Sequence, residues 1–118
     1  MEDIKIFFKS LYTNFNNRNI DLVIANMAGN VQWANGMDGG YVYGHDGVRA
    51  YWKKQFEIVS SNVTPLEIIE ENGIIKIKVW QVVHDVNGNL LSDNIVYHLF
   101  ALKKGKITRF DIDNNVAS

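Results

Sequence analysis

The chain has 118 residues, of which 47% are hydrophobic and 12% aromatic, and its formal net charge is -1. This length fits one domain, so we expect residues 1–118 to fold as a single unit around one core. The near-neutral charge gives no electrostatic basis for binding nucleic acid or an anionic membrane, and the absence of cysteine excludes disulfides and thiolate metal sites.

The first residues, MEDIKIFFKSLY, lack the long apolar run of a secretory signal. No apolar segment approaches the ~20 residues that a membrane span needs. We therefore expect a cytoplasmic protein that does not insert into a membrane.

Two helices are predicted at the start of the chain. Apolar residues recur at helical spacing from Ile4 to Phe15, which predicts the first helix. Asn19 is a candidate N-cap for a second helix that runs through Met27, with Gly29 as the residue that closes it.

A short strand and a glycine-rich segment follow. The alternating stretch VQWAN predicts a strand from Val31 to Asn35. Glycines then crowd together with tyrosines in Gly36–Gly44, which we interpret as a lip over a pocket, since glycine permits the sharp turns that a lip needs. A third helix begins near Gly44–Asp46. Its predicted buried stripe is Val48, Tyr51, Trp52, Gln55, Phe56 and Val59.

The pattern changes from helical to alternating after Pro65, the single proline. Turn pairs such as Asn-Gly separate four apolar runs, which predicts an antiparallel meander. The predicted strands are Leu66–Glu71, Ile74–Asp85, Leu90–Lys103 and Lys106–Asp113. Strands this long in a small domain must twist and bend. We therefore predict an α+β fold in which three N-terminal helices pack on the concave face of a strongly bent antiparallel sheet.

Four stretches of the chain together resemble a known family: NFNNRNIDLVIANMAGNVQW, GHDGVRAYWKKQF, VVHDVNGNLLSD and VYHLFALKKGKITRFDI. They are similar to the SnoaL-like branch of the nuclear-transport-factor-2-like superfamily, which includes ketosteroid isomerase, scytalone dehydratase and polyketide cyclases. The resemblance covers about Ile4 to Ile112. It implies a half-open, cystatin-like cone with a pocket between sheet and helices, and a homodimer formed through the outer sheet face. Because this superfamily hosts many chemistries, the resemblance implies the fold more strongly than an activity.

Two residues are candidates for catalysis. By resemblance to ketosteroid isomerase, the end of the first strand holds a carboxylate base, but this chain has Asn35 there, and an amide has no useful basicity. Asp38 lies nearby and is more simply a turn residue. His98 is near the strand position of an acidic proton donor in the isomerase and could act as acid, base or hydrogen-bond donor. A shift of one residue would place Tyr97 there instead.

Several further side chains are candidates for the pocket wall. Trp33 shares a strand face with Asn35, and the third helix turns Trp52 inward. The predicted ligand-binding residues are Tyr12, Trp33, Tyr43, Trp52, Phe56, Gln81 and Phe110. His45, His84 and His98 have no metal-ligand spacing, so we expect neither a metal nor a cofactor.

Three functional hypotheses remain open. The first is a cofactor-independent isomerase, dehydratase or cyclase that works by general acid-base catalysis with His98 and Asn35. The second is a non-catalytic binder of a small apolar or aromatic organic molecule. The third is a dimeric interaction module whose cone is closed by its own side chains.

Overall fold

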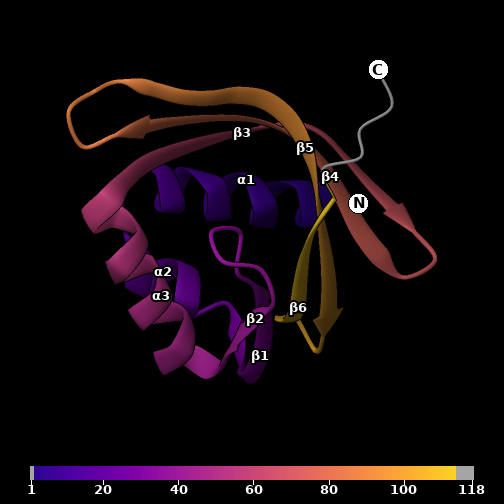
Figure 1. Cartoon of the computed structure of the whole chain (residues 1–118). Helices are drawn as coiled ribbons and strands as arrows, with labels where there is room; N and C mark the ends of the chain where they lie inside the picture. The colour runs from indigo at the N-terminus through magenta and orange to yellow at the C-terminus, as the bar shows by residue number, and fades with distance from the viewer. Residues whose placement is uncertain (1, 114–118) are drawn as a thin grey trace.

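The computed structural model describes residues 2–113, which form three helices and six strands (Figure 1). The helices are α1 (Glu2–Asn16), α2 (Ile20–Ile24) and α3 (Gly44–Ile58). The strands are β1 (Met27–Ala34), β2 (Tyr41–Tyr43), β3 (Val59–Glu71), β4 (Ile74–Asp85), β5 (Leu90–Lys103) and β6 (Lys106–Asp113). The fold class is α+β, as predicted.

All six strands belong to one curved sheet in the order β2-β1-β6-β5-β4-β3. Strands β3 to β6 form the predicted antiparallel meander. The sheet as a whole is mixed rather than antiparallel, because β1 pairs parallel with β6. Figure 1 shows the long strands curving over α1, with α2 and α3 lying on the same side of the sheet as α1.

One hydrophobic core lies between the helices and the concave face of the sheet. Each helix contributes buried side chains, among them Phe8, Val23 and Trp52, and the sheet contributes alternate residues such as Ile77 and Phe100. Alternation along a strand sends every second side chain to the same face, so β5 presents Val96, His98 and Phe100 inward.

The second helix is shorter than predicted. It ends at Ile24, and Met27 and Gly29 lie in β1, which begins four residues before the predicted Val31. The reason is long-range pairing, since the backbone N–H of Ile107 donates to the carbonyl oxygen of Asn26 at 2.9 Å and Met27 lies opposite Ile107. Tertiary pairing here overrides the helical spacing of the apolar residues.

The change from helix to strand comes at Val59, six residues before Pro65. Val59 was predicted to end the buried stripe of the third helix, but it is the first residue of β3. Pro65 lies within β3, at an irregularity of the pairing with β4. Because β3 is an edge strand, a proline without an N–H is tolerated there.

The outer edge of β3 is covered by side chains from the end of α1 and from the turn that follows it. The Asn16 amide donates to the carbonyl oxygen of Val63 at 2.8 Å and accepts from the Val63 N–H at 2.9 Å. The Arg18 guanidinium donates to the carbonyl oxygen of Ser61 at 2.8 Å. These contacts complete hydrogen bonds that a neighbouring strand would otherwise supply.

No helix among the described residues is long and apolar enough to cross a membrane. A cytoplasmic location stays a prediction.

Candidate functional site

A cavity of about 280 Å³ lies between the helices and the concave face of the sheet. We call it the inner chamber. Its aromatic wall consists of Tyr12, Phe15, Trp33, Tyr51, Trp52, His98, Phe100 and Phe110. The rings contact one another closely: Trp33 stacks on Phe110 with centroids 4.1 Å apart and meets Trp52 edge-on at 5.2 Å. Among the described residues that line the chamber, none carries a formal charge at neutral pH.

Tyr12 and His98 form a hydrogen-bonded pair in this wall. Tyr12 comes from α1 and His98 from the centre of β5, and the Tyr12 hydroxyl lies 2.7 Å from Nδ1 of His98. His98 has 7% of its surface exposed and Tyr12 only 4%. Tyr97, the alternative to His98 in the sequence, points to the opposite face, where its ring lies under the Lys76 ammonium group.

Burial decides the protonation states of the pair. Burial lowers the pKa of His98 to about 3, so the imidazole is neutral at pH 7. Burial also raises the pKa of Tyr12 well above its ordinary value, so the hydroxyl stays protonated. A phenol hydroxyl is a stronger hydrogen-bond donor than a neutral imidazole N–H, so we assign the Tyr12 hydroxyl as the donor to Nδ1 of His98 and the imidazole proton to Nε2.

Gln55 and Tyr51 are among the chamber side chains that sequence reasoning did not name as site residues. Gln55 was assigned only to the buried stripe of the third helix, yet its Oε1 is enclosed and has no hydrogen-bond partner in the described part of the chain. Tyr51 lines the chamber and accepts a hydrogen bond from the Gly36 N–H at 3.0 Å. Burial raises the pKa of Tyr51. Helical spacing places Tyr51 and Gln55 on the inward face of α3, and this spacing is the sequence signal that could have identified them as site residues.

A second, more polar cavity of about 400 Å³ adjoins the chamber, and we call it the vestibule. It lies between the loop 35–40 and the ends of β4, β5 and β6. Its polar side chains are Asn35, Tyr41, Gln81, Ser92, Asn94 and Asp111. Five residues line both cavities, namely Ala34, Gly36, Gln81, Ser92 and Ile112.

Asn35 organises the loop beside the vestibule. Its Oδ1 accepts from the N–H groups of Met37 and Asp38 at 3.0 and 2.9 Å, and its backbone oxygen accepts from Gly39. Gly39 and Gly40 follow at φ +80° and +72°, where glycine carries no steric cost. The predicted lip is therefore a hydrogen-bonded loop of residues 35–40 followed by the short strand β2.

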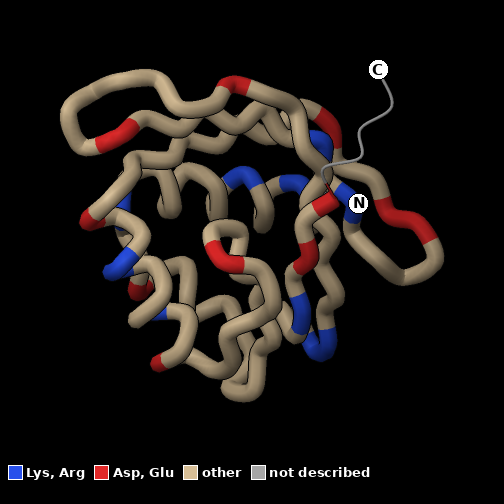
Figure 2. The backbone as a smooth tube through the Cα atoms, viewed as in Figure 1, with Lys and Arg blue, Asp and Glu red and all other residues tan. Residues whose placement is uncertain are grey.

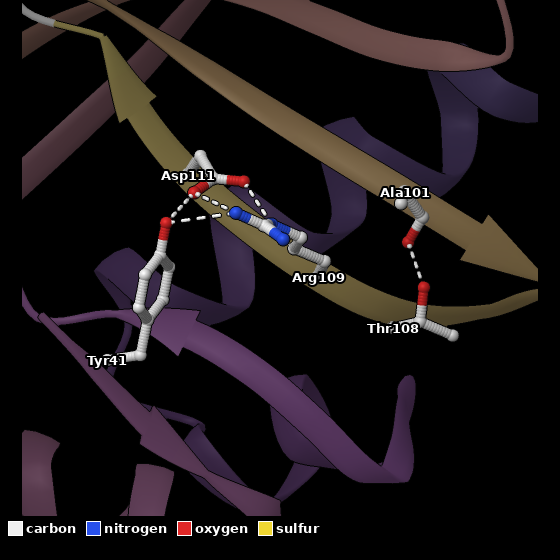
Figure 3. A network of polar contacts seen from close by, with 5 residues as sticks. All are labelled: Tyr41, Ala101, Thr108, Arg109 and Asp111. Atoms are coloured by element: carbon white, nitrogen blue, oxygen red, sulfur yellow. Dashed lines mark hydrogen bonds and ion pairs between the residues drawn. The ribbon is translucent and has the colours of Figure 1, made fainter.

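The outer wall of the vestibule carries a network of three side chains (Figure 3). Arg109 donates to Asp111 at 2.7 Å and to the Tyr41 hydroxyl at 3.1 Å, while Tyr41 donates to Asp111. Burial acts to raise the pKa of Asp111, but hydrogen bonds from Arg109 and Tyr41 outweigh it, so the pKa is lowered. Asp111 therefore remains a carboxylate at neutral pH.

The structure brings most of the predicted site residues together. Tyr12, Trp33, Trp52, Gln81, His98 and Phe110 line the inner chamber. Asn35 lines the vestibule instead. Phe56 packs against Phe15 and under the Arg18 guanidinium, and Tyr43 is 62% exposed on the outer face of the sheet, so neither lines a described cavity.

Within the described residues, no three His, Cys, Asp or Glu side chains gather as a metal site requires. The expectation of no cofactor stays a prediction.

The sequence matches a model of the SnoaL-like domain over residues 8–110. No curated protein matches the chain. Among solved structures, an NTF2-like protein of unknown function from Burkholderia pseudomallei superposes with a TM-score of 0.83 at 25% identity, covering 95% of this chain and 90% of its own. TerC, co-crystallised with polyporic acid, superposes with a TM-score of 0.79 at 22% identity, covering 89% of this chain and 85% of its own. A candidate polyketide cyclase from Pseudomonas putida superposes with a TM-score of 0.79 at 14% identity, covering 92% of this chain and 89% of its own.

Proposed function

The chain belongs to the SnoaL-like domain family, and from this premise we propose that it binds a small, uncharged aromatic or apolar organic molecule in the inner chamber and acts on it without a cofactor. The reaction class we propose is that of an isomerase, dehydratase or cyclase. His98 is the residue that contacts the reacting group.

The observation that carries this proposal is the buried Tyr12–His98 pair in a wall that is mainly aromatic and aliphatic. A mostly apolar cavity with a few fixed polar groups is typical of small-molecule sites. The volume of about 280 Å³ lies at the small end for such sites, and it argues against a cone closed by its own side chains. Without a charged side chain on the wall, a charged ligand would lose its hydration with no compensating partner.

The pair suggests a particular role for His98. With its proton on Nε2 and Nδ1 occupied by Tyr12, the imidazole offers one N–H to a ligand. A neutral imidazole with a pKa of about 3 is a poor base, so His98 acts as a donor that polarises a carbonyl or stabilises a developing oxyanion. Tyr12 fixes the tautomer and orientation of the ring.

A second candidate function is binding without catalysis. The observation that favours it is the absence of a carboxylate among the described residues of the chamber wall, since isomerisation needs a base as well as a polarising donor. TerC, which shares the fold, was crystallised with polyporic acid, and this supports a small organic ligand under either function.

We also propose a homodimer formed through the outer face of the sheet. Trp80 is 44% exposed there, and Ile95, Tyr97 and Leu99 of β5 lie only half-buried on the same face. A second copy would cover these partly exposed apolar side chains on a face that carries no helix, burying about 800 Å² per subunit. Sedimentation at micromolar concentration should give twice the chain mass, and a monomer would contradict the proposal.

Calorimetric titration with 2-naphthol, a neutral hydroxylated aromatic probe, tests ligand binding. We expect saturable binding that His98→Gln weakens by about 0.5–1.5 kcal/mol, the net contribution of one hydrogen bond. His84→Gln is the matched control, because His84 lies on β4 outside both cavities. No binding, or equal affinities of the two variants, would contradict the proposal.

Hydrogen-deuterium exchange next to the carbonyl of 2-tetralone separates enzyme from binder. If His98 polarises a bound carbonyl during turnover, the wild-type protein accelerates exchange measured by NMR, and His98→Gln slows it by roughly 100-fold or more. Binding without acceleration would support the non-catalytic alternative.

A further inference from the structure

We propose that the site takes a two-part ligand, with an aromatic head in the inner chamber and an uncharged, hydroxylated tail in the vestibule. This inference rests on the proposed function for the head and adds a substrate class, a neutral aromatic compound carrying a polyhydroxylated substituent such as a sugar. Nothing in the family membership specifies such a tail.

The first argument is the border that the two cavities share. Gln81 and Ser92, on the neighbouring strands β4 and β5, have surface in both. Gly36 also lines both cavities and has no side chain to narrow the space between them. A Cβ added at this position would lie 3.2 Å from Cδ1 of Ile112. The two cavities therefore adjoin across shared residues, so a ligand that reaches from one into the other would pass beside Gln81 and Ser92.

The second argument is the contrast in chemistry. The chamber wall carries eight aromatic rings together with the amides of Gln55 and Gln81, whereas the vestibule has one ring, Tyr41, and three side-chain amides, from Asn35, Gln81 and Asn94. Each amide both donates and accepts hydrogen bonds, which suits neighbouring hydroxyl groups. Gln81 and Asn94 lie opposite each other in the β4–β5 pairing, and neither side chain makes a hydrogen bond to another described residue.

Asn35 adds a donor on the opposite wall. Its Oδ1 is occupied by the N–H groups of Met37 and Asp38, so its Nδ2 is the part of the amide left for a ligand. The same two hydrogen bonds hold the side chain in place. The vestibule thus places an oriented donor across from the amides of β4 and β5.

The third argument is charge. Figure 2 shows acidic positions on the loop between β1 and β2 and on β6. Asp111 lines the vestibule as a carboxylate whose charge is partly balanced by Arg109, and Asp38 lies in the loop. An anionic tail would meet like charge here, whereas an uncharged tail would not.

Calorimetry with three related probes tests the inference: 2-naphthol, 2-naphthyl β-D-glucoside and 2-naphthyl β-D-glucuronide. The glucoside and glucuronide have the same ring but differ by one carboxylate. We expect the glucoside to bind about threefold to tenfold tighter than naphthol, as one or two net hydrogen bonds would give. The glucuronide should bind at least about threefold more weakly than the glucoside.

The variant Asn94→Leu keeps the side-chain size and removes the amide. It should bring the affinity ratio of glucoside to naphthol close to one. Asn62→Leu is the matched control, an exposed asparagine on β3 that lines neither cavity, and it should leave the ratio unchanged.

The outcomes separate the two proposals. If naphthol binds but the glucoside binds equally or more weakly, the two-part ligand is wrong and the chamber proposal stands. If the glucuronide binds as tightly as the glucoside, or if both leucine variants change the ratio alike, the assignment of the tail to the vestibule is wrong. If no probe binds, the proposed function fails as well.

Discussion

The inner chamber and the vestibule share a border but are built by different means. The chamber wall consists of side chains that helical spacing and strand alternation turn inward, such as Trp52 on α3 and His98 on β5. The vestibule consists of strand ends and a loop that Asn35 holds by local hydrogen bonds. Residues of the chamber therefore serve the stability of the fold as well as any ligand, whereas the vestibule includes side chains such as Asn94 that make no hydrogen bond to another described residue.

Replacing Trp52 by alanine should give the largest effect and tests whether the chamber wall is core. Trp52 is 3% exposed and contacts Trp33 and Phe15, so we expect a loss of about 3–5 kcal/mol in the free energy of unfolding, measured by denaturant titration. Trp80→Ala, on the exposed outer face, should cost about 1 kcal/mol, and Asn94→Ala in the vestibule less than about 0.5 kcal/mol. If Trp52→Ala and Asn94→Ala lowered the free energy of unfolding by similar amounts, the chamber wall would contribute no more to stability than the vestibule does.

The pH dependence of stability tests the neutral state of His98. The folded chain holds the imidazole neutral down to a pKa of about 3, while the unfolded chain takes up a proton near pH 6.5. The stabilisation is therefore complete above pH 6.5 and declines as the pH falls toward 3, by on the order of a few kcal/mol.

His98→Gln supplies the comparison for this pH dependence. Between about pH 6.5 and 5.5, above the range in which most carboxylates titrate, stability should fall in the wild-type protein and change less in the variant, measured by denaturant titration at each pH. Parallel curves for the two proteins in this range would show that His98 is not the group responsible.

Replacing Tyr12 by phenylalanine should have an intermediate effect. The change keeps the ring but leaves Nδ1 of His98 without its donor, at a cost of about 1–3 kcal/mol for an unsatisfied buried group. It also frees the imidazole to change tautomer, which NMR of the ring nitrogens would detect. Tyr51→Phe, on the opposite wall, is the matched control and should leave the His98 tautomer as it is. An unchanged tautomer in Tyr12→Phe would contradict the role assigned to Tyr12.

Replacing Asn35 by alanine should have only a small effect on global stability, at most about 1 kcal/mol, because most of the loop 35–40 is exposed. The local effect should be clear, since the amides of Met37 and Asp38 lose their acceptor and should exchange with solvent faster. Asp38→Ala serves as control, as its side chain supports neither hydrogen bond. Unchanged exchange in Asn35→Ala would show that the loop is held by other contacts.

The sequence predicts the chamber better than the vestibule for a physical reason. Periodicity reports which face of an element is buried, and on that basis Trp33, Trp52 and Phe110 were expected on the wall where the structure places them. Periodicity does not report how a loop folds on itself or where a strand ends. Asn35 was therefore expected on the chamber wall, although its Oδ1 is occupied by its own loop.

Long-range pairing explains the differences in the fold. The spacing of Ile20, Val23 and Met27 fits a helix, yet β6 draws Met27 into a parallel pair that no local pattern reveals. Pro65 was read as a boundary because proline interrupts regular structure, but an edge strand accommodates it. In both cases the deciding partner lies far away in the sequence.

The cover that Asn16 and Arg18 provide for β3 has a consequence for the way in which the chain can fail. These two side chains cover the free edge of β3, so this edge stays protected only while α1 remains packed against the sheet. A chain in which α1 has come away presents free backbone groups of Ser61 and Val63 next to a long, β-prone strand, and such an edge can recruit the same strand of another molecule. The docked first helix thus protects the chain against aggregation, in addition to forming part of the chamber wall.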